Sequence, residues 1–318
     1  MGKRFLATCL WLISAMSCMF YDEASAAEKK VALMWHGKSV MQNRVALGFL
    51  ARAKEIEPNL AVSVRMEIPT PEAAADIFWE FEKNVDGIIY LRSFGAEFLA
   101  RAKTRLPLFI GGCNDPRALG VVKNLEAPEG NITGVTYNIP FEKRFEVIQA
   151  LFPQAKSVGI VLQKNHPVTA IEGPATREQC QKLGLRYHEI VPKDRGELTE
   201  AVALLAQNVD LIIISNCVVA FDNVTAILPA ANKRGIPIFS YEEKAVKRGA
   251  VAGIAASDEK LGRLLADSVV DVVVKGKPIA QVPIKMDPDH KILVNVEMMR
   301  YLGLTFPKRV MEKAQLIE

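Results

Sequence analysis

The sequence predicts an α/β protein with two lobes joined by a hinge, each lobe a doubly wound parallel sheet flanked by helices. Three observations support this fold class. The chain has 318 residues, half of them hydrophobic, which suffices for more than one core. Short β-rich apolar runs alternate with longer amphipathic stretches, as in parallel α/β sheets. This alternation occurs twice along the chain.

The predicted strands are rich in Val and Ile and are bounded by Gly, Pro, Asn or Asp, as is typical of buried parallel strands. They span Val31–Met34, Ala61–Met66, Gly87–Leu91, Leu108–Ile110, Ser157–Leu162, Arg186–Val191, Leu211–Ile214, Ile236–Phe239 and Val251–Ile254. Between them, apolar residues recur at helical spacing, for example over Asn43–Ile56 and Glu259–Lys275.

The two series of alternating elements define the two lobes. The first series ends near Gly134, and the second begins at Ser157 after an interruption at Tyr137–Pro140. A tail with several prolines follows Ser257 and is long enough to cross the hinge again. We therefore expect an N-terminal lobe of residues 27–136 with about 256–285, and a C-terminal lobe of residues 137–255 with about 286–318.

Residues 1–26 have the features of a cleavable secretory signal. Lys3 and Arg4 precede an apolar run, Phe5–Phe20, and Ala24-Ser25-Ala26 supplies the small residues that a signal peptidase requires. About sixteen residues are too few for a helix that spans a bilayer, which needs ~20. We expect an exported, periplasmic protein. The alternative is a lipid anchor on Cys18, although the Leu usual three residues before such a cysteine is missing.

Charge and cysteine content exclude several classes of protein. The net charge is +4, from 40 basic and 36 acidic residues that form no block, so a face that binds nucleic acid is not expected. Beyond residue 26 the cysteines are Cys113, Cys180 and Cys217, an odd number without CxxC spacing, which argues against a disulfide scaffold and a zinc site. We expect buried free thiols, no metal and no cofactor.

Ligands of open parallel sheets bind beyond the carboxyl ends of the strands, where helix N-termini converge. These positions hold aromatic and hydrogen-bonding side chains, namely Trp35 and His36, Arg92 to Phe94, Asn114 and Asp115, Asn165, Asn216 and Cys217, and Tyr241 and Glu242. The sequence has no G-x-S-x-G, GxxxxGK[ST] or HExxH motif, and no GxGxxG after the first strand. An enzyme is therefore not expected.

Several of these candidates have a plain structural role as an alternative. Trp35 fits a plug at the top of its lobe as well as a stacking platform, and Arg92 fits a solvated surface charge as well as a carboxylate clamp. Asn114 and Asp115, followed by a proline, have the form of a turn or helix cap. Glu242 would favour the positive end of a helix whatever it binds.

From about Gly130 to the C-terminus, the sequence resembles the substrate-binding proteins of ABC transporters, whose best-known members carry aromatic amino acids. The matching stretches are Gly130–Thr136, Phe152–Ile160, Ala231–Phe239, Lys247–Ala250, Lys275–Pro278, Leu293–Val296 and Leu302–Pro307. The resemblance implies a type I periplasmic-binding-protein fold, with a solute held between lobes that close on a hinge. It also implies an ABC permease in the inner membrane as the partner.

Departures from the family pattern concern the ligand. Gln163–Thr169 stands where amino-acid binders usually have Asn-Pro-Ser-x-Pro-Asn-Ser, so only Pro167 and a hydroxyl at Thr169 are kept. Cys217 stands where they usually place an Asp that pairs with the ligand ammonium, and a neutral thiol cannot replace that charge. A free α-amino acid and a different small solute both stay open.

Strand-end positions and family pattern together give one set of candidate ligand-binding residues: Trp35, His36, Arg92, Ser93, Phe94, Asn114, Asp115, Thr136, Tyr137, Asn165, Thr169, Asn216, Cys217, Tyr241, Glu242 and Asp258. The aromatic members suit a ligand with an apolar or planar part. We expect a monomeric solute-binding component of an ABC importer that captures a small solute, amino-acid-like or aromatic. The alternative is a ligand-sensing periplasmic protein that reports to a membrane receptor.

Overall fold

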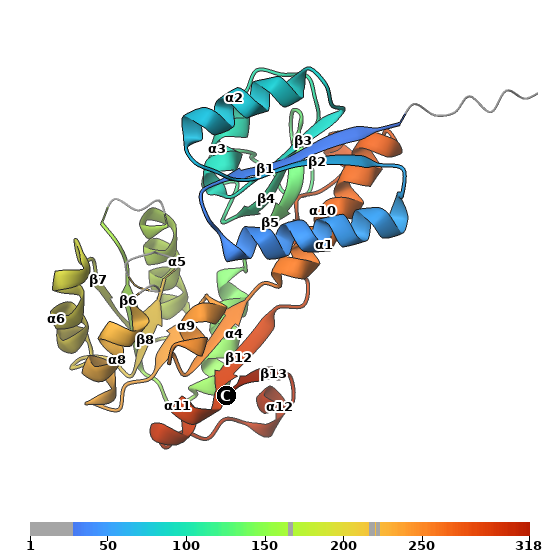
Figure 1. Ribbon diagram of the computed structural model, residues 1–318. Helices are drawn as coiled ribbons and strands as arrows, with labels where there is room; N and C mark the ends of the chain where they lie inside the picture. The colour runs from blue at the N-terminus through green and yellow to red at the C-terminus, as the bar shows by residue number, and fades with distance from the viewer. Residues whose placement is uncertain (1–27, 165–167, 216–219, 221–222) are drawn as a thin grey trace, which may run out of the picture.

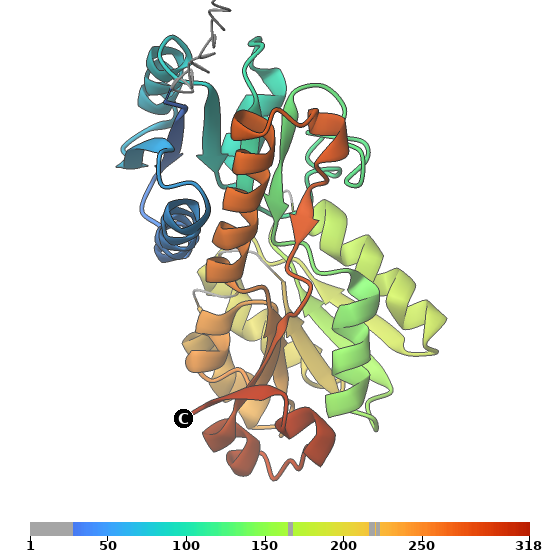
Figure 2. The ribbon, with the colours of Figure 1, turned by 90° about the vertical axis from the view of Figure 1, so that its right-hand side faces the viewer.

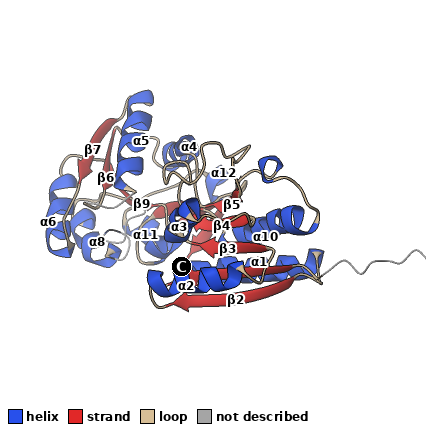
Figure 3. Cartoon of the chain, turned by 90° about the horizontal axis from the view of Figure 1, so that it is seen from above, coloured by secondary structure: helices blue, strands red, loops and turns tan. Residues whose placement is uncertain are grey.

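The chain forms two lobes, each built on its own β-sheet (Figure 1). The structure is a computed structural model that describes residues 28–164, 168–215, 220 and 223–318. The expected secretory signal, as well as Asn165, Asn216 and Cys217, lies outside the described residues. Seen from above in Figure 3, strands β6 and β7 of the second sheet lie apart from β2, β3 and β4 of the first.

The sheet of the first lobe has six strands in the order β11-β5-β4-β3-β1-β2, and every neighbouring pair is parallel. The strands are β1 (Lys30–His36), β2 (Ala61–Ile68), β3 (Gly87–Leu91), β4 (Leu108–Cys113), β5 (Ile132–Thr136) and β11 (Lys285–Met286). Strands β1, β3, β4 and β5 are almost completely buried, which agrees with their continuous apolar sequences. The predicted doubly wound parallel sheet is confirmed.

Helices cover both faces of this first sheet. They are α1 (Val40–Ile56), α2 (Pro71–Glu82), α3 (Ser93–Arg101) and α10 (Asp258–Val269), which a π-helical turn extends over Val270–Val274. Buried residues of α1 and α10 belong to one core, and buried residues of α2 and α3 belong to the core on the opposite face. Helix α1 begins three residues earlier than its apolar periodicity predicts, because the Ser39 hydroxyl accepts a hydrogen bond from Gln42 N and caps it.

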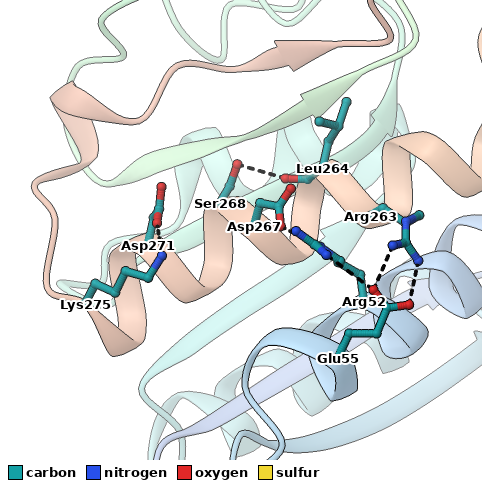
Figure 4. Close-up of polar contacts among 8 residues, drawn as sticks. All are labelled: Arg52, Glu55, Arg263, Leu264, Asp267, Ser268, Asp271 and Lys275. Carbon is teal, nitrogen blue, oxygen red and sulfur yellow. Dashed lines mark hydrogen bonds and ion pairs between the residues drawn. The ribbon is translucent and has the colours of Figure 1, made fainter.

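Helices α1 and α10 touch through glycine. A Cβ added to Gly262 would lie 2.1 Å from Val45 O, and one added to Gly48 would lie 2.4 Å from Glu259 O. Ion pairs flank this contact, with Arg52 Nε 2.9 Å from Asp267 and Arg263 Nη2 2.7 Å from Glu55 (Figure 4). The backbones therefore approach more closely than any residue with a side chain at these two positions would allow.

The sheet of the second lobe has seven strands in the order β13-β12-β10-β9-β8-β6-β7. They are β6 (Ser157–Val161), β7 (Arg186–Ile190), β8 (Leu211–Ile214), β9 (Ile238–Ser240), β10 (Ala252–Ala255), β12 (Lys291–Asn295) and β13 (Ala314–Ile317). The five strands from β7 to β10 are parallel, but β12 runs antiparallel to β10. The sheet is therefore mixed, because the chain enters β12 from the first lobe and not from a helix of the second.

The helices of the second lobe also lie on both faces of its sheet. They are α4 (Phe141–Leu151), α5 (Thr169–Lys182), α6 (Arg195–Leu205), α8 (Val224–Asn232), α9 (Glu243–Lys247), α11 (Val296–Tyr301) and α12 (Lys308–Met311). Helices α6, α8 and α9 share one core, and α4, α5 and α12 contribute to the other. Cys113 and Cys180, one in each lobe, are buried free thiols, and burial raises the pKa of each to about 12.

Three segments connect the lobes: residues 137–140 after β5, residues 256–257 after β10, and residues 287–290 after β11. In Figure 2, the chain that leads from β11 into β12 passes from the first lobe to the second, beside the start of α10. Asp287, which is 1% exposed, links the second and third connections, because its Oδ2 accepts a hydrogen bond of 2.7 Å from Ser257 N. Within the described parts of the chain, no helix has the length and apolarity to cross a membrane.

Candidate functional site

A pocket lies between the two lobes. Its residues come from α1, from the ends of β4, β9 and β10, from the first connection, and from the first turns of α4 and α10. They are Met41, Arg44, Asn114, Tyr137, Ile139, Arg144, Tyr241, Glu242, Glu243, Ala255, Ala256 and Asp258. The carboxyl ends of strands from both sheets therefore meet at one cavity.

An ion pair forms the first-lobe wall of this pocket. Arg44, on the first turn of α1, places Nη2 2.5 Å and Nε 2.6 Å from Oδ2 of Asp258, the first residue of α10. Burial raises the pKa of Asp258, although the guanidinium of Arg44 opposes that shift. Burial lowers the pKa of Arg44, but the charge of Asp258 and its hydrogen bond more than offset this, so the net shift of the Arg44 pKa is upward.

Two tyrosines contribute buried hydroxyl groups to the pocket. Tyr137 follows β5 in the first connection, and its backbone N–H donates to Cys113 O at 2.8 Å. Tyr241 follows β9 and is 6% exposed. Neither hydroxyl makes a hydrogen bond of ordinary geometry with a described residue, but Tyr137 interacts with the carboxylate of Asp258 and Tyr241 with the guanidinium of Arg144. Burial raises the pKa of both phenols well above the ordinary value, so both stay protonated.

Arg144 is fixed beneath Tyr241 by four contacts. Its guanidinium carbon lies 4.2 Å from the ring centre of Tyr241 and 4.3 Å from that of Phe141. Its Nε donates to Ile139 O at 2.8 Å, and its Nη1 lies 3.2 Å from Oε1 of Glu172 on α5. Both charged side chains are nearly inaccessible to water. The ion pair joins α4 to α5, and the hydrogen bond to Ile139 O joins α4 to the first connection.

Glu242 and Glu243 complete the second-lobe wall. Glu242 Oε2 accepts a hydrogen bond of 2.9 Å from Ala245 N and so caps α9, while burial raises the pKa of this carboxyl. Burial also opposes the charge of Glu243, but ion pairs with Lys247 at 2.6 Å and Lys291 at 3.5 Å lower its pKa.

A second, smaller pocket adjoins the first and shares Asn114, Tyr137 and Arg144 with it. Its other residues are Asp115, Asn138, Phe141, Val168, Ile171 and Glu172. Among the residues with described positions, no group of His, Cys, Asp and Glu could hold a metal ion.

The structure gathers some of the sequence-predicted residues at this site. Asn114, Tyr137, Tyr241, Glu242 and Asp258 line the main pocket, and Asp115 lines the adjoining one. Asn165, Asn216 and Cys217 lie outside the described residues. The remaining candidates line neither pocket.

Four of the remaining candidates form a separate cluster at the ends of β1 and β3. His36 Nδ1 lies 3.1 Å from the hydroxyl of Tyr90, and Arg92 Nη1 donates to His36 O at 2.8 Å. Phe94 contacts the His36 ring edge-on and is 63% exposed, and the hydroxyl of Ser93 accepts from Asn114 N at 3.4 Å. Burial and the charge of Arg92 lower the pKa of His36.

The other three outlying candidates have structural roles. Trp35 is 1% exposed and packs in the first-lobe core with Val31 and Leu33. The buried hydroxyl of Thr136 donates to Cys113 O, and the Thr169 hydroxyl donates to Gln163 O at 2.7 Å.

Arg44 and Arg144 are the main pocket residues that the sequence reasoning missed. That reasoning examined only the residues just after strands, whereas these two arginines lie on helices. A usable signal existed, because both lie in the first turns of helices that directly follow β1 and β5. Such turns face the carboxyl edge of the sheet.

Two lobes with mainly parallel sheets, three connections and an interlobe pocket define the fold of the periplasmic binding proteins. The fold of a substrate-binding protein with adhesive properties from Clostridium difficile, in its ligand-free open structure, matches with a TM-score of 0.81. That match covers 91% of this chain and 99% of the other, at 21% identity. A protein from Streptococcus pneumonia in complex with L-Trp matches with a TM-score of 0.75 at 20% identity, over 92% of this chain and 100% of that one.

Sequence comparison identifies the family. Residues 55–317 match the family described as ABC transporter substrate binding protein, and the chain belongs to it. It is also 24% identical over 238 residues to a tyrosine-binding protein of Clostridioides difficile (strain R20291), which covers 75% of this chain and 68% of that protein. The family is one of solute-binding proteins that are typically extracytoplasmic. The predicted family and fold are confirmed.

Proposed function

We propose that this protein captures a small solute between its two lobes and delivers it to an ABC permease. The observation that carries the proposal is the origin of the pocket walls: Arg44 and Asn114 come from the first lobe, and Tyr241 and Glu242 from the second. A solute in this pocket contacts both lobes fully only when they approach each other. Binding therefore selects the closed arrangement, which a permease can recognise.

Closure needs a hinge, and the three connections supply it. Residues 137–140, 256–257 and 287–290 are short segments between rigid, well-packed sheets. The first two also contribute Tyr137, Ile139 and Ala256 to the pocket. The connections that bend therefore also contact the ligand, so ligand binding directly affects the angle between the lobes.

The proposed solute is amino-acid-like or aromatic. The rings of Tyr137 and Tyr241 and the side chain of Met41 offer apolar surface to a planar ligand. Relatives named for tyrosine binding and crystallised with L-Trp support this class. Asn114, Tyr137, Tyr241, Glu242 and Asp258 are the proposed contacts.

We propose further that residues 1–26 are removed on export and that the protein acts as a monomer in the periplasm, without catalysing a reaction. The charged start, apolar run and Ala24-Ser25-Ala26 support export. We also propose that residues 27–136 and 256–285 move as one lobe and residues 137–255 and 286–318 as the other. Sheet membership supports this division, with Met286 the one residue that pairs into the opposite sheet.

The proposal can be tested without knowing the ligand, by comparing the wild-type protein with a variant whose pocket is blocked. The purified protein is screened by thermal shift against L-tyrosine, L-tryptophan, other amino acids, nucleosides and small organic acids. A ligand at a hundred times its Kd should stabilise the folded state by about 2.7 kcal/mol. In Met41→Trp the indole would fill the pocket, so the shift should disappear. Leu47→Trp, on the exposed face of the same helix, is the matched control and should respond like wild type.

Closure is tested by small-angle scattering, in which the protein with the stabilising compound should have a smaller radius of gyration than the protein alone. Delivery is tested with membranes that contain the cognate permease, which should hydrolyse ATP faster when the ligand-bound protein is added. Equal thermal shifts in Met41→Trp and wild type would contradict the interlobe site. Loss of the shift without permease stimulation would favour a sensor over an importer.

A further inference from the structure

A register shift at the end of β4 turns Asn114 toward the pocket. Leu108 and Ile110 face the core beneath α2 and α3, and Cys113, one residue out of the regular alternation, faces the same core. The pairing with β5 contains this extra residue, because three steps along β4 from Ile110 match two steps along β5. An extra residue moves the side chains that follow it to the opposite face. Asn114 therefore lines both pockets and does not point into that core.

Hydroxyl groups hold the backbone of Asn114 on both sides. The Ser93 hydroxyl accepts a hydrogen bond of 3.4 Å from Asn114 N, and the Thr136 hydroxyl donates to Asn114 O. Within the described parts of the chain, the carboxamide of Asn114 makes no hydrogen bond of its own. A carboxamide can both donate and accept, so this side chain is available to a polar group of the solute.

Thr136 joins Asn114 to the first connection. The side chain of Thr136 is completely buried at the end of β5. Its hydroxyl shares its proton between Asn114 O and Cys113 O, the latter at 3.0 Å, and accepts a hydrogen bond of 3.1 Å from Asn138 N. Asn138 belongs to the first connection and lines the adjoining pocket together with Asn114. One buried hydroxyl therefore fixes the end of β4 relative to a segment that we expect to bend on closure.

We propose that Thr136 is a positioning residue of the solute site and that it acts through Asn114. Its hydroxyl sets the position of the Asn114 carboxamide and keeps that position when the first connection bends. This inference rests on the proposed function and goes beyond it, because Thr136 itself lines neither pocket. A binding group contributes fully to affinity only when the residues behind it hold its geometry, so loss of this support should weaken binding.

Three variants separate positioning from stability. Thr136→Val removes the hydroxyl and keeps the size of the side chain, whereas Thr136→Ser keeps the hydroxyl. Thr133→Val is the matched control, because the Thr133 hydroxyl is equally buried on the same strand but donates to Val282 O, and Thr133 lines neither pocket. Both valine variants should lower the midpoint of thermal unfolding, since each leaves a buried backbone carbonyl without its partner.

Isothermal titration with L-tyrosine measures the effect on binding. Thr136→Val should raise the Kd about tenfold, as expected when one hydrogen bond to the solute is lost. Thr136→Ser and Thr133→Val should stay within about twofold of the wild-type Kd. In Asn114→Ala the contact with the solute is already absent, so the addition of Thr136→Val should raise the Kd no further.

Hydrogen exchange of the ligand-free protein tests the support of Asn114 without any solute. The amides of Asn114 and Asn138 should exchange faster in Thr136→Val than in wild type, Thr136→Ser or Thr133→Val. Unchanged exchange in Thr136→Val would overturn the inference, as would an equal rise in Kd in Thr133→Val or independent effects of the Thr136 and Asn114 changes.

The outcomes also separate this inference from the proposed function. If Thr136→Val binds L-tyrosine like wild type while Met41→Trp does not bind it, the positioning role fails and the interlobe site stands. If the wild-type protein does not bind L-tyrosine, the exchange measurement decides whether Thr136 supports Asn114, and the thermal-shift screen judges the proposed function.

Discussion

Gly262→Ala adds one methyl group where α10 meets α1. The new Cβ would lie 2.1 Å from Val45 O and 2.7 Å from Phe49 N, and both are backbone atoms that no rotamer change can move. The helices would have to separate by more than about 1 Å, and a gap of that size forfeits at least a quarter to a half of each dispersion contact across it. The buried residues Leu261 and Leu265 lie in this interface, so the loss spreads over the first-lobe core.

Two effects oppose each other in this variant. Alanine is the better helix former by about 1 kcal/mol. Overpacking costs about 1–3 kcal/mol, and a clash between two backbones belongs at the upper end of that range. We therefore expect a net loss of about 2 kcal/mol in the free energy of unfolding, or a midpoint lower by roughly 4–8 °C.

Urea unfolding followed by tryptophan fluorescence measures this loss, because Trp35 and Trp79 both lie in the first lobe. Gly196→Ala is the control. Gly196 lies in the first turn of α6, and only the side chain of Asp194, at 3.1 Å, is near its missing Cβ. Gly196→Ala should leave stability unchanged or slightly raise it. A midpoint for Gly262→Ala equal to or above that of wild type would refute the close backbone contact.

Two further predictions concern charged groups of the second lobe. Glu172→Gln leaves the buried guanidinium of Arg144 without its counter-charge and should lower the free energy of unfolding in urea by about 3 kcal/mol. The control, Glu178→Gln, breaks an exposed ion pair and should lower it by less than about 0.5 kcal/mol. Equal losses would contradict the burial of the Arg144–Glu172 pair. Burial opposes the charge of Asp210, but hydrogen bonds from the Ser157 hydroxyl and two backbone N–H groups lower the pKa of this carboxyl. Its stabilising effect is therefore complete above about pH 4 and is lost as pH falls through the lowered pKa, so the stability gap between wild type and Asp210→Asn should narrow from pH 5 to pH 3. A gap that is constant over that range would count against these hydrogen bonds.

The strand pattern was predictable because buried parallel strands have a strong local signal. Runs such as Leu211–Ile214 and Gly87–Leu91 are short and apolar throughout. A surface helix is longer and has polar residues on one face, so these runs indicate buried strands. The antiparallel placement of β12 was not predictable in this way. The direction of β12 depends on where the chain enters the second lobe after β11. No local sequence feature encodes that long-range pairing.

The site was predictable in part for the same reason. Asn114, Tyr241 and Glu242 follow strands directly, so topology alone brings them to the pocket. Trp35 follows a strand in the sequence-based prediction, but β1 extends to His36, and its period-two alternation continues from Val31 and Leu33 into the core. An error of two residues in a strand end thus changes a side chain from binding candidate to core residue.

The hydrogen bond from Ser257 N to Asp287 has a consequence for how the lobes swing. If the second and third connections were independent, the lobes could twist as well as bend. The buried carboxylate of Asp287 instead joins these two connections to each other. We therefore expect the second and third connections to bend together when the lobes move. A residue inserted into the second or third connection would break this link. The two walls of the pocket would then be displaced relative to each other on closure, although neither wall had changed.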